Sequence, residues 1–510
     1  MHQKKENTKR SIIIGTQKSC EEVSRMLQTH APAIHILGCL WLGQPHDQQT
    51  QTPLGQVQDA PQICKEKKIN RIYLSLPLIT IERYAKTISW IWQSGLEVVA
   101  LPTASDQLAG RALQALRMMN KNDAQTTTPS NKNDNNSLGM DLSSLINRQP
   151  QPLDLEAIRQ TIQDKRIMIT GAGGSIGSQI ARIVSSFNPE KIILIERSEN
   201  ALFEIDRKIK RIYPKIKRSA LLHDVTHFPK TIAMVKDEKP HVIFHAAAHK
   251  HVPMMEDHPA AAVENNFYGT RSIAQAASQN NVEKFVMIST DKAVNPSSVM
   301  GATKRIAELY VQHLNAHSKT TYCMVRFGNV LGSACSVLPI WEDQIKNGYG
   351  VTVTDKNMTR FFMTIPEAAG LVLQSAAMSG KSHAQGGEIF LLDMGKPVRI
   401  LDLAHRFVRS LGLEPNVDVP IHIVGPRPGE KLHEELAYEG EDMTSTTHPS
   451  IRLWRTQAPP PARIKQMLQI FDNLRNKGNT PGHDWQHANI KTIQAALHRA
   501  VPEMVSAIAG

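Results

Sequence analysis

Several features of secreted, membrane and metal-binding proteins are missing from this sequence of 510 residues. No stretch approaches the roughly 20 consecutive apolar residues that a membrane-spanning helix needs. The N-terminal segment MHQKKENTKRSIIIG has an apolar run that is too short for a signal peptide. The five cysteines are odd in number and form no CxxC pair, which argues against a disulfide framework or a zinc site. These absences predict a cytoplasmic protein with no transmembrane segment and no metal.

Long runs of one charge are also absent, although the net charge is +12. Such a charge is compatible with nucleic acid, a membrane surface or an anionic substrate as the partner. Because the Lys and Arg residues are spread along the chain, we expect a solvated positive surface and no nucleic-acid partner. Diffuse positive charge also suits a substrate that carries phosphate.

The first block of the sequence, residues 1–120, alternates short apolar runs with helix-like patterns. This alternation predicts a small parallel sheet with covering helices. The turn after the first run, GTQKSCEEV, lacks the spaced glycines that a dinucleotide pyrophosphate requires, which predicts a degenerate Rossmann-like domain with a structural or regulatory role. The predicted strands are 11–15, 34–40, 71–77 and 96–102, and the predicted helices lie near 20–28, 60–68 and 81–94.

A polar segment rich in Asn and Thr separates this block from a stronger series of strands and helices. Residues 121–150, which include KNDAQTTTPSNKNDNNS, are predicted to be a flexible linker. The series over 151–455 predicts an α/β catalytic domain, with a Rossmann-like doubly wound parallel sheet and a smaller substrate-binding lobe in its C-terminal part. The segment TQAPPPARI breaks the pattern, so residues 456–510 are predicted to form a helical tail.

A glycine-rich turn lies between a predicted strand and a predicted helix in KRIMITGAGGSIGSQIARIVSSF, residues 165–187. Three glycines fall at G-x-x-G-x-x-G spacing, with a fourth between them. Glycines permit a tight turn and close backbone approach, and the helix N-terminus offers free N–H groups to a pyrophosphate. The predicted pyrophosphate cradle consists of Gly171, Gly173, Gly174, Ser175, Ile176 and Gly177.

Residues at the ends of the following strands extend the predicted dinucleotide site. Glu196 ends KIILIER about 20 residues beyond the glycines, where a carboxylate accepts from ribose hydroxyls and repels a 2′-phosphate. This favours NAD over NADP, although the adjacent Arg197 argues in the other direction. Asp224 follows the strand in ALLHDV, at a position that reaches adenine. HVIFHAAAHKHVP supplies small residues where backbone passes close to a cofactor. The remaining predicted cofactor residues here are Val225, Ala246 and Ala247.

The segment STDKAVNPSSVMGATKR, residues 289–305, combines acid–base side chains with a missing tyrosine. Its Thr-Asp-Lys sequence follows the apolar strand KFVMIS at the carboxyl end, where open α/β sheets bind ligands. Lys304 has the spacing of a dehydrogenase-like site in which a Tyr four residues earlier removes a proton. Met300 takes that place, one helical turn before Lys304, and is expected to fill volume in the core. Lys304 is still expected to contact the nicotinamide ribose. Either the site is inactive, or another group carries the proton chemistry.

Eight motifs, in this order, resemble the UDP-N-acetylglucosamine 4,6-dehydratases of bacterial surface-glycan biosynthesis, which are extended short-chain dehydrogenase/reductases. The resemblance is strong over about 150–450 and fainter over 11–110. It is closest to the long, configuration-retaining members, which carry Met in place of the Tyr and usually begin with membrane helices. The motifs are TGAGGSIGS, HAAAHKHVPMME, STDKAVNP, MGATK, VRFGNVLGS, MTRFFMTIPEA, EIFLLDMG and RPGEKLHEEL.

The resemblance implies conversion of UDP-N-acetylglucosamine to a UDP-4-keto-6-deoxy sugar. Tightly bound NAD would be reduced at C4 oxidation and regenerated when the hydride returns to C6, after water is lost from C5 and C6. Asp291 is the implied acid at O6. Lys292 is the implied base at C5, with a pKa depressed by desolvation or by Lys304. Thr290, acting through water, is the candidate for the C4 hydroxyl. A homo-oligomer is expected.

Further residues match substrate-binding positions of the family. Asn329, expected at the end of the strand in VRFGNV, is implied to hold the UDP diphosphate. Arg360 and Arg427 have planar forks of donors that suit phosphate. Glu430 suits the uridine ribose hydroxyls, and Lys250 completes the predicted set.

Three classes of function remain open on the sequence: the dehydratase, a UDP-sugar C4 or C5 epimerase of the same fold, and a catalytically idle NAD-binding or scaffold protein. An ordinary C4 epimerase needs the Tyr that Met300 replaces. The idle protein is favoured by Met300 and by Ala334 and Cys335, because the family usually has Arg-Gly after GNVLGS.

Overall fold

The computed structural model describes most of the chain, in two compact units. Unit 1 comprises Met1–Leu145, Cys335–Lys356 and Arg399–Gly425, and unit 2 comprises Ile146–Ala334, Asn357–Val398 and Pro426–Gly510. Residues 121–141 of the predicted linker lie outside the described residues. The described residues are 10–32, 34–42, 53–108, 114, 118–119, 142–380, 387–438, 442–455, 457–475, 485 and 488–505.

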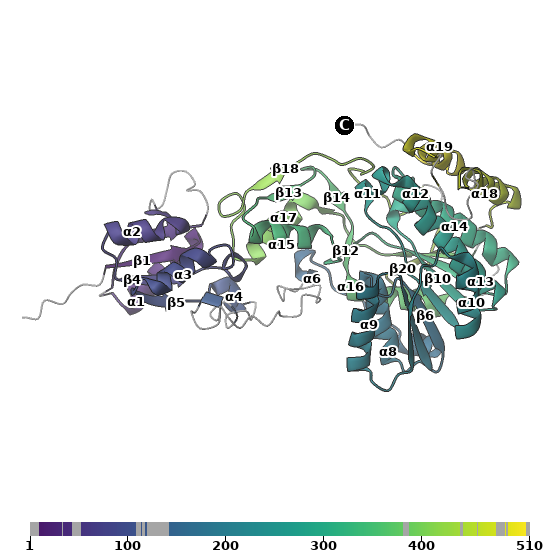
Figure 1. The fold of residues 1–510 in the computed structure, drawn as a ribbon, viewed down its shortest axis with the longest axis horizontal. Coiled ribbons are helices and arrows are strands. Elements are labelled where there is room, and N and C mark those ends of the chain that lie inside the picture. The colour runs from purple at the N-terminus through teal and green to yellow at the C-terminus, as the bar shows by residue number, and fades with distance from the viewer. Residues whose placement is uncertain are drawn as a thin grey trace, which may run out of the picture. The chain divides into compact units, whose positions relative to one another are not determined.

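Unit 1 contains a five-stranded parallel sheet with the order β3-β2-β1-β4-β5 (Figure 1). The sheet confirms the predicted strands and adds β3, which is too short to show alternation. Helix α1 begins after Thr16, whose side chain accepts a hydrogen bond from the Ser19 N–H. The strands are β1 (Arg10–Gly15), β2 (His35–Trp41), β3 (Gly55–Gln56), β4 (Arg71–Ser75) and β5 (Glu97–Ala100), and the helices are α1 (Gln17–His30), α2 (Ala60–Glu66), α3 (Ala85–Gln93), α4 (Ala104–Leu108) and α6 (Leu142–Leu145).

Two later stretches of chain also belong to unit 1. They contribute a small parallel pair of strands and two helices, in which Trp341 is fully buried and packs on Phe407. The elements are α15 (Val337–Lys346), β13 (Val351–Val353), α17 (Ile400–Ser410) and β18 (Ile421–Ile423).

Unit 2 is built on a nine-stranded sheet with the order β19-β20-β16-β11-β10-β9-β6-β7-β8. The seven strands from β16 to β8 are parallel, and β20 and β19 extend one edge antiparallel. The strand order reverses beside β6, because β7 lies on one side of it and β9 on the other. Ligands of open α/β sheets bind at the carboxyl ends of strands that flank such a reversal. The strands are β6 (Arg166–Thr170), β7 (Lys191–Glu196), β8 (Arg218–Leu222), β9 (Val242–His245), β10 (Lys284–Ile288), β11 (Thr321–Arg326), β16 (Glu388–Leu392), β19 (Met443–Ser445) and β20 (Ile451–Arg455).

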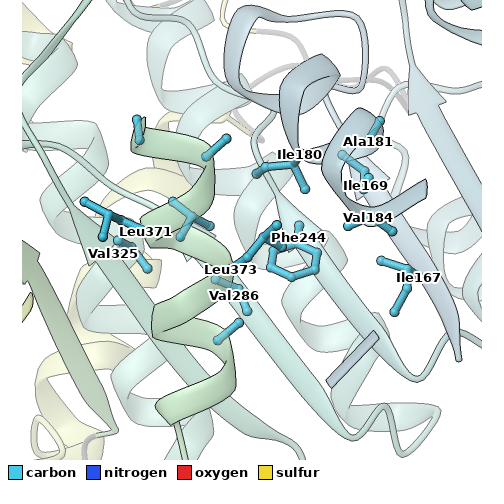
Figure 2. Close-up of a cluster of buried hydrophobic side chains, with 14 of the residues drawn as sticks. Ile167, Ile169, Ile180, Ala181, Val184, Phe244, Val286, Val325, Leu371 and Leu373 are labelled. Atoms are coloured by element: carbon cyan, nitrogen blue, oxygen red, sulfur yellow. The ribbon is translucent and has the colours of Figure 1, made fainter. Parts of the chain in front are cut away.

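Helices bury both faces of this sheet, as a doubly wound fold requires. On one face, Ile167, Ile169 and Phe244 pack with residues of α8 and α16 (Figure 2). On the other face, Met168 and Phe285 pack with residues of α13 and α14. The predicted α/β class with a second Rossmann-like sheet is confirmed. The helices are α7 (Leu155–Ile162), α8 (Ser175–Ser186), α9 (Glu199–Ile212), α10 (Phe228–Glu238), α11 (Val252–Asp257), α12 (Pro259–Ala262), α13 (Gly269–Gln279), α14 (Val299–His317) and α16 (Ile365–Met378).

The C-terminal segment contains two helices, α18 (Pro461–Arg475) and α19 (Ile490–Ala500). They pack on α14 and on the π-helical segment Val263–Tyr268 in an apolar cluster that includes Met300. None of the helices in the described ranges is both long enough and apolar enough to cross a membrane.

Candidate active site

The glycine turn between β6 and α8 has no room for side chains. Gly171 has φ +65°, and a Cβ there would lie 2.7 Å from the Ala247 nitrogen. A Cβ at Gly177 would lie 2.1 Å from the Gly171 carbonyl oxygen, and one at Gly173 would lie 2.5 Å from the Ala201 Cβ. The turn therefore brings backbone against backbone at the start of α8, which is the arrangement that a pyrophosphate needs.

A cavity of about 220 Å³ opens beside this turn, at the reversal of strand order. Much of its lining was predicted as cofactor-binding: Gly171, Gly174, Glu196, Arg197, Asp224, Val225, Ala246 and Ala247. The predicted residues that do not line it are Gly173, Ser175, Ile176, Gly177 and Lys304. The lining residues that sequence reasoning missed are Ile195, His223, Ala248, His249 and Asn265.

Glu196 is tied to the glycine turn by backbone hydrogen bonds. Its Oε2 accepts from the Gly173 N–H at 3.1 Å, and its Oε1 accepts from the Arg197 and Ser198 N–H groups at 3.0 and 3.2 Å. These bonds hold the carboxylate at the end of β7, next to the turn. A negative charge in this place disfavours a 2′-phosphate and suits ribose hydroxyls.

Asp224 supplies a second carboxylate to the cavity. Burial raises its pKa, but hydrogen bonds from Thr226 and the nearby Arg197 outweigh burial, so the pKa of Asp224 is lowered. The guanidinium of Arg197 lies 3.9 Å from Asp224 and donates to Asn265 Oδ1 at 3.3 Å. Arg197 is therefore engaged along one wall of the cavity.

The Thr-Asp-Lys sequence lies directly after β10 and points inward. Thr290 Oγ1 donates to Asp291 Oδ1 at 2.9 Å, and the Lys292 N–H donates to Thr290 Oγ1 at 3.4 Å. Asp291 is fully buried, and its Oδ2 has no hydrogen-bond partner among the residues that the structure describes. A Cβ at Gly328 would lie 3.1 Å from that oxygen, so the glycine leaves space beside it.

Lys292 is surrounded by acceptors. Its Nζ lies 3.0 Å from Asp291 Oδ1, 2.9 Å from Asn329 Oδ1 and 3.8 Å from Glu434 Oε1. Burial lowers its pKa, but the carboxylates of Asp291 and Glu434 outweigh burial, so the pKa of Lys292 is raised. The expected depressed pKa is wrong for this arrangement, because two carboxylates surround the ammonium and Lys304 is not among the charges that act on it.

Lys304, unlike Lys292, has a depressed pKa. It is buried on α14, and its Nζ donates to the Ile288 carbonyl oxygen at 2.7 Å. Burial lowers the pKa of Lys304 to about 8, and Glu308 opposes this shift only in part. Met300, one turn earlier, is 4% exposed within the apolar cluster, which confirms it as a volume filler.

His245 was not predicted as a site residue, although it ends β9 at the reversal of strand order. Its ring nitrogens lie 2.7 Å from Thr170 Oγ1 and 2.9 Å from Thr270 Oγ1. Complete burial and the charge of Lys304 lower the pKa of His245 to about 3. The imidazole is therefore neutral and fixed between two hydroxyl groups.

Three of the predicted substrate residues, Arg360, Arg427 and Glu430, are already bonded to protein partners. Arg360 is buried and donates to the carbonyl oxygens of Thr359 and Lys431 at 2.7 and 2.8 Å. This placement gives no support to a phosphate contact, and it holds the segment that carries Glu434, which lies 3.7 Å from the Arg360 Nε. Arg427 is more than half exposed and donates to Glu430 Oε1 at 2.6 Å, so these two residues pair with each other.

Of the other predicted substrate residues, Asn329 contacts Lys292, and Lys250 contacts Ala334. Asn329 does not end a strand as expected, because β11 ends at Arg326 and Asn329 begins the short strand β12 (Asn329–Leu331). The pairing of β12 with β15 (Phe362–Thr364) presents its side chain to Lys292. Lys250 Nζ donates to the Ala334 carbonyl oxygen at 2.7 Å.

Ala334 and Cys335 stand where the family usually has Arg-Gly, and Ala334 lies beside the glycine turn. The Ala334 N–H donates to Ser175 Oγ, at the first residue of α8, at 3.1 Å. Cys335 follows with φ +54°, a left-handed conformation that favours glycine. Glu434, in the RPGEKLHEEL motif, is the acidic site residue that the sequence reasoning missed, and its place in that motif was the available signal.

In the described parts of the chain, no cluster of three or more His, Cys, Asp or Glu side chains is arranged to hold a metal ion. The cavity, the glycine turn and the two carboxylates instead suit a dinucleotide.

These features define a Rossmann-type α/β protein in which Asp291 and Lys292 pair after β10, at the carboxyl edge of the sheet. Residues 167–456 match the model of a family described as polysaccharide biosynthesis protein, and the chain belongs to that family. It is 44% identical over 389 residues to the capsular polysaccharide biosynthesis protein CapD of Staphylococcus aureus, a match that covers 76% of this chain and 61% of CapD. The chain thus spans about three fifths of the length of that relative.

Two further similarities each cover more than half of the chain. The chain is 33% identical over 301 residues to an inverting UDP-N-acetylglucosamine 4,6-dehydratase of Campylobacter jejuni, covering 56% of this chain and 84% of that protein. The solved structure of Pen from Bacillus thuringiensis aligns with a TM-score of 0.52 and 31% identity, over 59% of this chain and 93% of Pen.

Proposed function

We propose that this protein is an NAD-dependent 4,6-dehydratase that converts UDP-N-acetylglucosamine to a UDP-4-keto-6-deoxy sugar for surface-polysaccharide biosynthesis. One observation carries the proposal: Lys292, whose side chain is partly exposed, pairs with the fully buried Asp291 at the carboxyl end of β10, and one Asp291 oxygen has no hydrogen-bond partner within the described chain. The similarity to the C. jejuni dehydratase supports this choice of reaction.

The residues around the cavity fit NAD. The glycine turn between β6 and α8, which has no space for side chains, suits the pyrophosphate together with the first turn of α8. The carboxylates of Glu196 and Asp224 suit the adenosine. Bound NAD supplies reversible hydride transfer, which allows the sugar to be oxidised at C4 and reduced at C6. Lys304 Nζ contacts the end of β10, and the neighbouring strand β9 leads into Ala246 and Ala247 of the cavity lining. At this place the Lys304 ammonium suits the hydroxyls of the second ribose.

The Asp291–Lys292 pair already holds the proton that elimination needs. Transfer of one proton from Lys292 Nζ to Asp291 across their 3.0 Å contact converts the ion pair into a neutral amine and a carboxylic acid. A substrate that expels water favours this neutral pair, because desolvation disfavours charge. The amine then removes the C5 proton of the 4-keto sugar, and the acid protonates the departing C6 hydroxyl, so one water leaves.

The proton count closes over one turnover. Lys292 returns its proton to C5 when C6 is reduced, and Asp291 has lost one proton to the departing water. The proton that leaves the C4 hydroxyl during oxidation passes to solvent, and one proton taken up from solvent after C6 is reduced restores the pair, so the net loss is one water. Thr290, whose hydroxyl lies 2.9 Å from Asp291 Oδ1, is the proposed route, through water, for the C4 proton.

Incubation of the purified protein with UDP-N-acetylglucosamine, followed by mass spectrometry of the sugar nucleotide, tests the proposal. Loss of one water is the expected result. An unchanged mass with altered stereochemistry at C4 or C5 would identify an epimerase. The absence of any conversion by a protein that retains NAD would identify an idle binding protein and overturn the proposal.

A further inference from the structure

The turn from Ser289 to Ala293 is held at both ends by side chains that do not belong to it. At its start, Ser289 Oγ donates to Glu308 Oε1 at 2.7 Å. At its end, the Tyr438 hydroxyl donates to the Ala293 carbonyl oxygen at 2.9 Å. The proposed catalytic residues Asp291 and Lys292 lie between these two anchors.

The two anchors are joined beneath the turn. Glu308 is fully buried, and Arg326 donates to its two oxygens at 2.8 Å each. Arg305 Nη1 lies 3.2 Å from the same carboxylate. The guanidinium groups of Arg305 and Arg326 lie 5.2 and 5.7 Å from the centre of the Tyr438 ring. A continuous path of contacts therefore runs from Ser289 through Glu308 and the two arginines to Tyr438.

The C-terminal tail joins this path. Arg305 Nε lies 3.0 Å from Glu503 Oε1, beyond the end of α19. The Val505 N–H donates to the carbonyl oxygen of Pro296, in the loop that follows the turn, at 3.0 Å. The tail thus contacts both the charged path and the chain next to the proposed site.

The ionic cluster of Glu308, Arg305 and Arg326 fixes the geometry of the turn more than it adds to the stability of the fold. Burial raises the pKa of Glu308, but Arg326 and Arg305 outweigh burial, and the pKa falls to about 2. Glu308 therefore stays ionised, and its bonds fix one arrangement. Buried ion pairs are often no more stabilising than apolar residues of the same size, and fixing a single arrangement is the role best attested for them.

We propose that Glu308 and Tyr438 are positioning residues that hold Asp291 and Lys292 in reactive register, and that the C-terminal tail completes this support through Glu503. The inference rests on the proposed function for its catalytic consequence. A displacement of about 1 Å in a reacting group can lower a rate by roughly 100-fold, so a loosened turn should appear in kcat.

Tyr438→Phe is the sharpest test, because the chain offers a matched control. The Tyr322 hydroxyl also donates to a backbone carbonyl, that of Ala274, at 2.8 Å, but it lies in β11 away from the turn. We expect Tyr438→Phe to lower kcat about tenfold while KM and bound NAD stay within about twofold, whereas Tyr322→Phe leaves kcat unchanged. Equal kcat in the two variants would overturn the inference.

Glu503→Gln tests the contribution of the tail. The control is Glu238→Gln, which weakens a comparable pair with Lys191 at 2.7 Å in another part of unit 2. We expect Glu503→Gln to lower kcat about threefold and the control to leave it unchanged.

Hydrogen exchange separates this inference from the proposed function, because it needs no turnover. Peptides that span 289–298 should exchange faster in Tyr438→Phe and Glu503→Gln than in the two controls. Unchanged exchange in these peptides would refute the positioning role, whatever the wild-type protein does with UDP-N-acetylglucosamine. Faster exchange in the two variants, together with a wild-type protein that forms no dehydrated product, would refute only the proposed reaction.

Discussion

Lys292 Nζ lies 3.0 Å from the carboxylate of Asp291, its neighbour in sequence, which is fully buried. The short helical turn Asp291–Ala293 brings the two side chains together, and the Lys292 side chain stays 18% exposed. Glu434 and Asn329 complete the surroundings of the ammonium. The proposed acid and base are thus coupled, and one proton moving between them changes both roles.

This coupling predicts that charge alone at residue 292 will not sustain turnover. Lys292→Arg keeps a cation beside Asp291 and Glu434, but a guanidinium does not deprotonate near neutral pH. We expect Lys292→Arg and Asp291→Asn each to lower kcat about 1,000-fold or more, with NAD still bound. The measurement is dehydrated product by mass spectrometry together with NAD released on denaturation.

Lys191→Arg is the matched control, because it makes the same change at the Lys191–Glu238 pair. Its activity should equal that of the wild type. If Lys292→Arg keeps a tenth or more of the wild-type kcat, Lys292 is not the base.

The glycine turn predicts a loss of cofactor on a single methyl addition. In Gly177→Ala, the new Cβ would meet the Gly171 carbonyl oxygen at 2.1 Å and push the turn out of shape. We expect bound NAD to fall at least about tenfold while the circular dichroism spectrum stays that of a folded protein. Gly380→Ala is the control, because no atom of the described residues lies within 4 Å of a Cβ at that position. Normal NAD content in Gly177→Ala would remove the assigned cradle.

Much of the fold follows from the sequence because its signals are local. Apolar strands alternate with amphipathic helices, and the glycines must lie where β6 meets α8, so the grouping of Glu196 and Asp224 with this turn around one cavity could be predicted. The short strand β3 gave no such signal, because two residues show no periodicity.

The electrostatics of the site could not be predicted in the same way. The pKa of Lys292 depends on Glu434, and only the tertiary fold brings that carboxylate to within 3.8 Å. Arg360 has a side chain suited to phosphate, but its donors bind backbone carbonyl oxygens that the sequence does not place near it. The residue types show which side chains can donate, accept or carry charge, but only the tertiary structure determines which of these groups are in contact.

Because the pKa of Lys304 is depressed in the folded protein, burying this lysine lowers the free energy of unfolding by an amount that depends on pH. The folded protein favours the neutral amine, so the unfolded chain binds more protons between a pH of about 8 and the ordinary lysine pKa of 10.5. The cost is fully present below pH 8 and disappears as the pH rises toward 10.5. Lys304→Met should therefore gain about 2–3 kcal/mol in the free energy of unfolding at pH 7, less what the lost bond to Ile288 contributed.

Denaturant unfolding at pH 7 and pH 9.5 measures this effect. The advantage of Lys304→Met over the wild type should be smaller at pH 9.5. An advantage that grows with pH would contradict the assigned direction. Lys284→Met is the comparison, because Lys284 is a partly buried lysine outside the site whose pKa is also lowered by desolvation.

Met300 predicts what restoring the tyrosine would do. Met300 packs with Val299, Phe471 and Leu497 in the apolar cluster that the C-terminal tail closes. A tyrosine there adds volume and a buried hydroxyl, so we expect Met300→Tyr to lower the free energy of unfolding by about 1–3 kcal/mol, whereas Met300→Leu costs less than about 1.5 kcal/mol. Because the phenol would meet this cluster, Met300→Tyr should form no C4 epimer of UDP-N-acetylglucosamine. Detection of that epimer by NMR would show instead that residue 300 reaches the substrate, and that the missing tyrosine alone sets this protein apart from an epimerase.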